Sequence, residues 1–180
     1  NNLRVQVRGT SDSVLIQNWF ISSGYRLNQF KFSDGTTLTA AQLEAESYKV
    51  LGTTGNDSLT GSAYKDALYG NAGNDTLNGV GGDDVLYGED GADALVGGIG
   101  NDTFSGGAGN DYLQGDSGSD TYLFGPGGGG DTIYDYFSGD TGVDTLEFTG
   151  GIDRADVDFL VEGNNLRVQV RGTSDSVLIQ

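Results

Sequence analysis

The sequence predicts an all-β protein built around a right-handed parallel β-roll solenoid of about four coils, with caps at both ends made of antiparallel strands and a short helix. Three observations lead to this prediction. Nine-residue units rich in glycine and aspartate follow one another without a break over residues 52–123. Each unit carries a large apolar residue at the same position. The stretches on either side alternate apolar and polar residues, as half-buried strands do.

The composition is unusual for a globular chain. Of 180 residues, 32 are glycine, one is proline and none is cysteine or histidine, and the formal net charge is −17. Low hydrophobicity with such a charge is typical of disorder, unless the acidic side chains bind metal ions. An acidic surface repels phosphates, so nucleic acid is not an expected partner. We also find no apolar run of the roughly 18 residues that a membrane span requires.

Eight consecutive units can be aligned from Gly52 to Leu123. Position one is glycine and position six is aspartate in every unit, and position four is glycine in all units but the second, where Tyr64 stands. Position eight carries the apolar residues, which are Leu59, Leu68, Leu77, Leu86, Leu95, Phe104, Leu113 and Tyr122. A solvated acidic linker would not keep these features in phase, so the repeat favours a solenoid.

Each unit predicts a tight turn followed by a short strand. Glycines at positions one and four permit positive φ and a close approach of backbones, which a tight turn needs. Positions seven to nine then form a strand whose position-eight side chain points inward. Two units make one coil, and coils stacked about 4.8 Å apart give two parallel sheets around an apolar core. Because turns alternate between two edges, each unit lies over the unit two places further along.

This stacking gathers the aspartates of position six into two ladders. One ladder contains Asp57, Asp75, Asp93 and Asp111, and the other contains Asp66, Asp84, Asp102 and Asp120. Like charges about 5 Å apart repel each other, and a hard cation between them converts repulsion into binding. Calcium suits such a site because it takes six to eight oxygen ligands, whereas magnesium retains water and zinc prefers nitrogen or sulfur.

Backbone carbonyls of the turns are expected to complete the coordination of each ion. We expect them near most of the glycines of positions one and four, namely Gly52, Gly70, Gly73, Gly79, Gly82, Gly88, Gly91, Gly97, Gly100, Gly106, Gly109, Gly115 and Gly118.

The units resemble the RTX family of calcium-binding β-roll repeats, whose consensus is G-G-x-G-x-D-x-U-x. The resemblance covers residues 52–123 closely and extends over 120–135, where Asp131 is expected to close the last site with Asp111. Residues 139–147 fit the consensus again with Asp144 at position six, which leaves a metal ligand and a loop acid as open alternatives. Lys65 lies beside Asp66, so we expect a weak or empty Asp66–Asp84 site. The remaining pairs predict about six to seven calcium ions.

The flanks, residues 1–51 and 124–180, are predicted to be caps. Residues 25–32, 166–170 and 176–180 alternate like strands of antiparallel hairpins, with a turn at 171–175. Thr39 and Gln42 form a capping box, which predicts a helix from there to about Tyr48. Residues 32–43, FSDGTTLTAAQL, resemble the segments that follow RTX arrays. Capping surface is expected from Trp19, Phe20, Phe30 and Phe32, and the alternative is a ligand-binding aromatic patch.

A second repeat is longer. Residues 1–17, NNLRVQVRGTSDSVLIQ, recur without change at 164–180. The simplest explanation is a parent protein with long tandem repeats, of which this chain is a slice, and an engineered duplication is the alternative. Residues 164–180 lack the strands and helix that follow residue 17, so association with other copies of the chain is a further hypothesis.

Function is predicted from these features together. The chain lacks histidine, cysteine and a G-x-S-x-G motif, and its regular acids are committed to the ladders, so we expect no enzyme. The residues predict a structural module that folds on binding calcium. The RTX resemblance implies a secreted bacterial protein, extracellular or at the cell surface, exported by a one-step type I route. Tandem repetition favours an extender, and the alternative is a carbohydrate- or surface-binding adhesin module that uses the flanks.

Overall fold

The computed structural model describes residues 3–6, 13–16, 27, 29–44, 48–135 and 140–180. Two compact units make up the chain, Asn1–Glu46 and Ser47–Gln180. Trp19 and Phe20, which we expected in a cap, lie outside the described residues.

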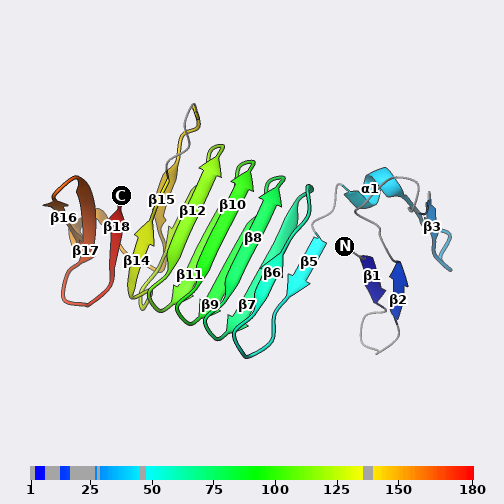
Figure 1. Cartoon of the computed structure of the whole chain (residues 1–180), viewed down its shortest axis with the longest axis horizontal. Helices are drawn as coiled ribbons and strands as arrows, with labels where there is room; N and C mark the ends of the chain where they lie inside the picture. Colours follow the sequence, from blue (N-terminus) through cyan, green and yellow to red (C-terminus); the bar gives the residue numbers. More distant parts are fainter. Residues whose placement is uncertain (1–2, 7–12, 17–26, 28, 45–47, 136–139) are drawn as a thin grey trace. The chain divides into compact units, whose positions relative to one another are not determined.

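The larger unit contains two sheets of stacked parallel strands (Figure 1). One sheet consists of β5 (Tyr48–Leu51), β7 (Asp66–Ala72), β9 (Val85–Asp90), β11 (Thr103–Ala108), β13 (Thr121–Phe124) and β15 (Thr145–Phe148). The parallel part of the other consists of β6 (Ser58–Thr60), β8 (Thr76–Gly81), β10 (Ala94–Ile99), β12 (Tyr112–Ser117) and β14 (Gly130–Ile133). Consecutive strands therefore belong to opposite sheets, as two units per coil require.

The strand register confirms the predicted coil. Leu95 pairs with Leu77 on one side and with Leu113 on the other, eighteen residues away in each direction. Position eight points inward, because Leu68, Leu77, Leu86, Leu95 and Phe104 are all fully buried and form the central column of the core. The side chains of position nine leave the opposite face of the sheet.

The roll is longer than the predicted four coils, because strands outside the eight units join both sheets. At its start, Tyr48 pairs in parallel with Asp66, and Val50 packs against the core. The expectation of a helix reaching about Tyr48 is therefore wrong at that residue, because Tyr48 begins β5; the described part of helix α1 is Ala40–Glu44. Pairing with β7 satisfies the backbone of β5, which an isolated helix end would not do.

Antiparallel strands close the C-terminal end of the roll. They are β16 (Val157–Glu162), which follows a 3-10 turn at Arg154–Asp156, then β17 (Asn165–Val170) and β18 (Ser176–Ile179). This confirms the predicted hairpin, and β18 also pairs in parallel with β14. Four valines of the cap, Val157, Val168, Val170 and Val177, extend the core beyond the nonapeptides.

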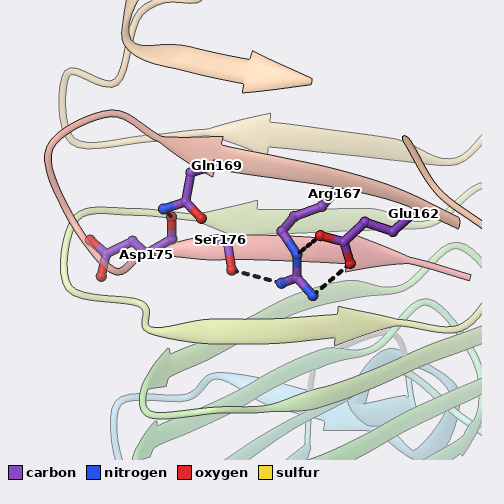
Figure 2. A network of polar contacts seen from close by, with 5 residues as sticks. All are labelled: Glu162, Arg167, Gln169, Asp175 and Ser176. Atoms are coloured by element: carbon purple, nitrogen blue, oxygen red, sulfur yellow. Dashed lines mark hydrogen bonds and ion pairs between the residues drawn. The ribbon is translucent and has the colours of Figure 1, made fainter. Parts of the chain in front are cut away.

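Polar contacts fasten the strands of this cap to one another (Figure 2). The Arg167 guanidinium donates to both carboxylate oxygens of Glu162, at 2.8 and 3.1 Å, and to Oγ of Ser176 at 3.1 Å. Gln169 Nε2 donates to the backbone oxygen of Asp175 at 3.0 Å. The Asp175 carboxylate in turn accepts the N–H of Gly127 at 2.8 Å, so the cap is also tied to the loop before β14.

The smaller unit contains two short hairpins and α1. Its strands are β1 (Leu3–Gln6), β2 (Ser13–Ile16), β3 (Gln29–Lys31) and β4 (Thr37–Thr39). The capping box is confirmed, because the Gln42 N–H donates to Thr39 Oγ1 and the Thr39 N–H donates to Gln42 Oε1. In the described part of the chain, no helix has the length and apolar character that crossing a membrane would need.

Candidate metal centre

Hydrogen bonds between successive coils align the position-six aspartates into the two predicted ladders. In the first ladder, the Asp75 N–H donates to Oδ1 of Asp93 at 2.7 Å. In the second, the Asp84 N–H donates to Oδ1 of Asp102 at the same distance. The remaining rungs of the eight units repeat this bond over eighteen residues, at 2.7 to 2.9 Å. Oδ1 therefore has a structural role in stacking the coils.

The second oxygen of these carboxylates has no such role. Oδ2 is buried and has no hydrogen-bond partner in Asp75, Asp84, Asp93, Asp102, Asp111 and Asp120. A buried polar atom without a partner costs free energy, and a charged atom costs more. Six buried anionic oxygens in two columns are a donor set that fits hard divalent cations.

The first aspartate of each ladder differs from the later ones, because its Oδ2 has hydrogen-bond partners. There the residue after the position-one glycine supplies a donor: the Thr53 N–H binds Asp57 Oδ2, and the Ser62 N–H binds Asp66 Oδ2, both at 2.6 Å. In the six later units the position-two residue has a positive φ, which is unusual for residues other than glycine. The six are Asn71, Val80, Glu89, Gly98, Gly107 and Asp116, with φ from 70° to 108°. Their turns leave Oδ2 unpaired, so the conformation of position two separates the later aspartates from the first two.

Backbone carbonyls are stacked beside the ladders, where further ligands were expected. A Cβ on Gly91 would collide with the carbonyl of Gly73, and a Cβ on Gly109 would collide with that of Gly91. At position one, a Cβ on Gly79 would lie 2.8 Å from the carbonyl oxygen of Gly97, and one on Gly88 would lie closer still to that of Gly106, which is also too close. Only glycine permits this approach, so the repeat brings columns of carbonyl oxygen to the same turns as the carboxylates.

Burial and mutual repulsion make these carboxyls weaker acids. Burial raises the pKa of Asp84 to about 8, and the charges of Asp102 and Asp66 add to the effect. Burial, then repulsion, raises the pKa of Asp120 and of Asp131 to about 7. For Asp102 and Asp111 burial likewise raises the pKa to about 6. Cations and protons therefore compete for these sites near neutral pH.

Both ladders continue past the eight units. The Asp111 N–H donates to Oδ1 of Asp131 at 3.1 Å, so Asp131 takes the next rung where it was expected. The Asp120 N–H donates to Oδ1 of Asp144 at 3.0 Å. These steps span 20 and 24 residues instead of eighteen. Asp144 therefore lies on the second ladder. That it is a metal ligand, and not only an acid of a loop, stays a prediction.

Sequence reasoning missed an outer row of contacts at position five. Oδ1 of Asn56 accepts the N–H of Asn74, and Oδ1 of Asn74 accepts the N–H of Ala92. On the other edge Asp83 and Asn101 do the same for Asn101 and Ser119. The signal was present in the sequence, because asparagine or aspartate fills position five in five of the eight units. These side chains satisfy turn amides that the strand ladders leave open.

Comparisons with known proteins agree with this arrangement. Residues 51–86, 69–104, 87–122 and 96–133 match the model of the RTX calcium-binding nonapeptide repeat. Residues 2–42 match the haemolysin-type calcium binding protein related domain. No curated protein sequence matches the chain.

Two solved structures are similar to this chain, both with low TM-scores. The extracellular lipase LipA from Serratia marcescens is 17% identical, with a TM-score of 0.37, over 74% of this chain and 38% of the lipase. The AlgE6R3 subunit of the mannuronan C5-epimerase from Azotobacter vinelandii is 25% identical, with a TM-score of 0.24, over 75% of this chain and 76% of that subunit. This chain spans well under half the length of the lipase.

Proposed function

Because residues 51–133 belong to the RTX calcium-binding nonapeptide repeats, we propose that the chain is a structural module that folds when calcium fills its aspartate ladders. The observation that carries this proposal is the set of six buried Oδ2 atoms without partners. An ordinary folded protein pairs nearly all such atoms. A column of cations would pair them all at once.

The ions would number six, one for each unpaired Oδ2, and this count includes Asp84, whose site with Asp66 we expected to be weak or empty. Each would lie at a turn, between coils that Oδ1 already holds in register. The carboxylates of the ladders and the stacked carbonyls of positions one and four would be its ligands. Asp57 and Asp66 already accept two hydrogen bonds each at Oδ2 from Thr53 and Ser62. We therefore assign them a secondary role, at the first rung of each ladder.

Folding and ion binding would be coupled by mass action. A ligand that binds only the folded state stabilises it by RT ln(1 + [L]/Kd), or about 2.7 kcal/mol per site when the free concentration is a hundred times Kd. Without ions, burying unpaired carboxylates opposes folding. Several sites in series make the transition steep, because each coil contacts only its neighbours.

Far-ultraviolet circular dichroism tests the proposal directly. The spectrum should change from that of a coil to that of β-structure on adding millimolar calcium, and the same concentration of magnesium should have a much smaller effect. A chain that is equally folded in chelator would show that the apolar column and caps suffice, and that calcium is not the switch.

The biological setting proposed for the module is outside a bacterial cell. Family membership supports it, since the implied type I route exports an unfolded chain that would fold where calcium is plentiful. The tandem duplication supports an extender in a surface protein. We propose no enzymatic role, because the ordered acids are held in ladders whose Oδ1 atoms bind backbone amides.

An adhesin module is the second candidate, and one observation favours it, although this observation lies on the nonapeptide array and not on the flanks where we expected the binding surface. Tyr69 and Tyr87 occupy position nine on adjacent strands, and their rings stack at 5.0 Å and 14°. The Lys49 ammonium lies 5.9 Å from the Tyr69 ring centre. Stacked aromatic rings on a sheet face can bind sugar rings. Chemical-shift changes at these tyrosines on adding soluble polysaccharide, abolished by Tyr69→Ala, would support it, and unchanged spectra would eliminate it.

Association between copies is proposed from the duplicated hairpin. Leu3 pairs with Ile16 in β1–β2, and Leu166 pairs with Ile179 in β17–β18, so both copies have the same register. The C-terminal copy pairs with β14, and the N-terminal copy offers an equivalent edge. If the N-terminal hairpin of one chain took the place of the C-terminal hairpin of another chain beside β14, the two chains would be joined. Light scattering in calcium at high concentration should then show dimers, whereas a strictly monomeric protein would contradict the hypothesis.

A further inference from the structure

The end of the second ladder gathers a third carboxylate that lies outside the nonapeptide phase. Asp135 follows β14 by two residues, whereas Asp120 and Asp144 immediately precede β13 and β15. One carboxylate oxygen from each of the three lies within 4.8 Å of the others. Among the described residues, the cap contains two ion pairs, Arg167–Glu162 and Arg171–Asp158, and neither includes one of these three aspartates. Three formal negative charges thus meet where the roll passes into its C-terminal loops.

Asp120 supplies an observation independent of the cluster. Its side chain is 1% exposed, and its Oδ2 has no hydrogen-bond partner, although its Oδ1 accepts the N–H of Asp102. A Cβ on Gly115 would collide with both this Oδ2 and the hydroxyl of Tyr122. The unpaired oxygen therefore lies on the same side as Tyr122, which is the side from which Asp135 approaches.

Tyr122 fixes the position of Asp135. The Tyr122 hydroxyl donates to Oδ2 of Asp135 at 2.8 Å, and the tyrosine ring is buried and stacked on Phe104 at 5.0 Å. Asp144 is fixed from the other side by the Asp120 amide. All three carboxylates thus have one oxygen held by a hydrogen bond, and the cluster is built by the fold rather than by chance on the surface.

We propose that Asp120, Asp135 and Asp144 hold a divalent cation at the C-terminal end of the second ladder. This site rests on the proposed calcium-binding function and deepens it, because it has three carboxylates where lower rungs have two. More anionic ligands give a tighter calcium site. The ion would bind the segment after β14 and the start of β15 to the last turn of the array.

Calorimetric titration with calcium tests the site in the full chain. Asp135→Asn should bind one ion fewer than the wild type, or bind it at least tenfold more weakly. Glu147→Gln is the matched control, because it removes the same charge from an exposed side chain of β15 and should keep the wild-type count. An unchanged count and affinity in Asp135→Asn would overturn the inference.

The outcomes separate this site from the proposed function. A wild type that binds no calcium would refute both. A wild type that binds calcium beside an unaltered Asp135→Asn would refute the site alone.

A second measurement does not depend on how well Asp135→Asn folds. Terbium takes calcium sites and emits when a nearby tyrosine absorbs light. Tyr122→Phe removes both the nearby tyrosine and the hydrogen bond that fixes Asp135, so it should reduce tyrosine-excited terbium emission, while the apolar core is kept because Phe104 shows that phenylalanine fits position eight. Tyr87→Phe on the outer face is its control and should retain the ion count. Emission of Tyr122→Phe equal to that of the wild type would place the ion elsewhere.

Discussion

The backbone N–H of Asp84 donates a 2.7 Å hydrogen bond to Oδ1 of Asp102, eighteen residues further along the chain, while Oδ2 of both side chains is buried without a partner. The two oxygens of one carboxylate thus have different roles. One holds the coils in register, and the other is available to a cation. Variants that keep the first role and remove the second can separate stacking from ion binding.

Asp84→Asn should have opposite effects with and without calcium. Asparagine keeps an Oδ1 acceptor for the Asp66 amide but removes a charge that burial and neighbouring carboxylates disfavour. The calcium-free fold should therefore gain stability, and the calcium-bound fold should lose about 2 kcal/mol or more as one site weakens. Circular dichroism in chelator, where the wild type is proposed to be a coil, gives the first change as added β-structure, and the urea midpoint in millimolar calcium gives the second.

Asp83→Asn is the matched control for that experiment. It removes the same charge from the neighbouring, exposed side chain and retains the acceptor for Asn101. Its effects should be smaller than those of Asp84→Asn in both conditions, because the Asp83 charge repels Asp84 and Asp102 only from an exposed side chain. A loss of stability in Asp84→Asn that is equal with and without calcium would mean that the carboxylate acts in packing only.

The stability of the calcium-free chain should fall as pH rises. The folded pKa is about 8 for Asp84 and about 7 for Asp120 and Asp131, above the ordinary value of 3.8. A carboxyl whose pKa is raised by folding stabilises the fold below its unfolded pKa, and this contribution is lost as pH rises through the folded pKa. Stability should therefore fall from the ordinary pKa of 3.8 up to about pH 8 and level off above it.

Saturating calcium should reverse this trend, because the ions bind the deprotonated carboxylates. Circular dichroism at about pH 5.5 and about pH 8 provides the test, in calcium-free buffer and in excess calcium. A calcium-free β-structure content that increases with pH would show that the buried aspartates are not what opposes folding.

Gly91→Ala should disrupt the stack of turns. Gly91 has φ +147°, and an added Cβ would collide with the carbonyl of Gly73 in the coil below. Gly127 also has a positive φ, +81°, but an added Cβ would meet nothing within 4 Å. Gly127→Ala should therefore cost only the backbone strain, about 1–2 kcal/mol, and Gly91→Ala more than about 3 kcal/mol. Equal losses in calcium-bound urea unfolding would contradict the close stacking.

Val80→Asn should stabilise the protein. Val80 has φ 83°, which a β-branched residue adopts only with strain, and its side chain is 44% exposed, so little apolar burial would be lost. Asparagine tolerates this conformation, so a gain of about 1 kcal/mol is expected in calcium. Val143→Asn is the control, since Val143 is exposed and lacks a positive φ. A gain of the same size in both variants would mean that replacing an exposed valine by a polar residue is stabilising whatever its backbone conformation.

The periodic part of the fold could be predicted from the sequence, because one pattern sets both the core and the edges. Leu95 lies between Leu77 and Leu113, and Asp84 lies beside Asp102, as positions eight and six of the repeat require. The pairing register of the strands follows once each coil is eighteen residues long. A strand shifted by one residue would expose its leucine and bury its polar side chains.

The ends of the roll could not be predicted in the same way. Tyr48 begins a strand where a helix was expected, because the open edge of β7 offers hydrogen bonds that local propensity does not reveal. Asp131 and Asp144 reach their rungs after 20 and 24 residues, so loop length hides the ladder. Asp135 has no position in the repeat at all, and only the path of the chain after β14 brings it to Asp120.

The alternation of turns between two edges restricts how such a roll can change its length. Removing nine residues would place every later strand in the opposite sheet. Strand β14, and the cap that pairs with it through β18, would then have to join the sheet that now ends at β15. Removing eighteen would leave each strand in its own sheet and each aspartate on its own edge. Insertions and deletions tolerated by this architecture should therefore come in whole coils, although the visible repeat in the sequence is half as long.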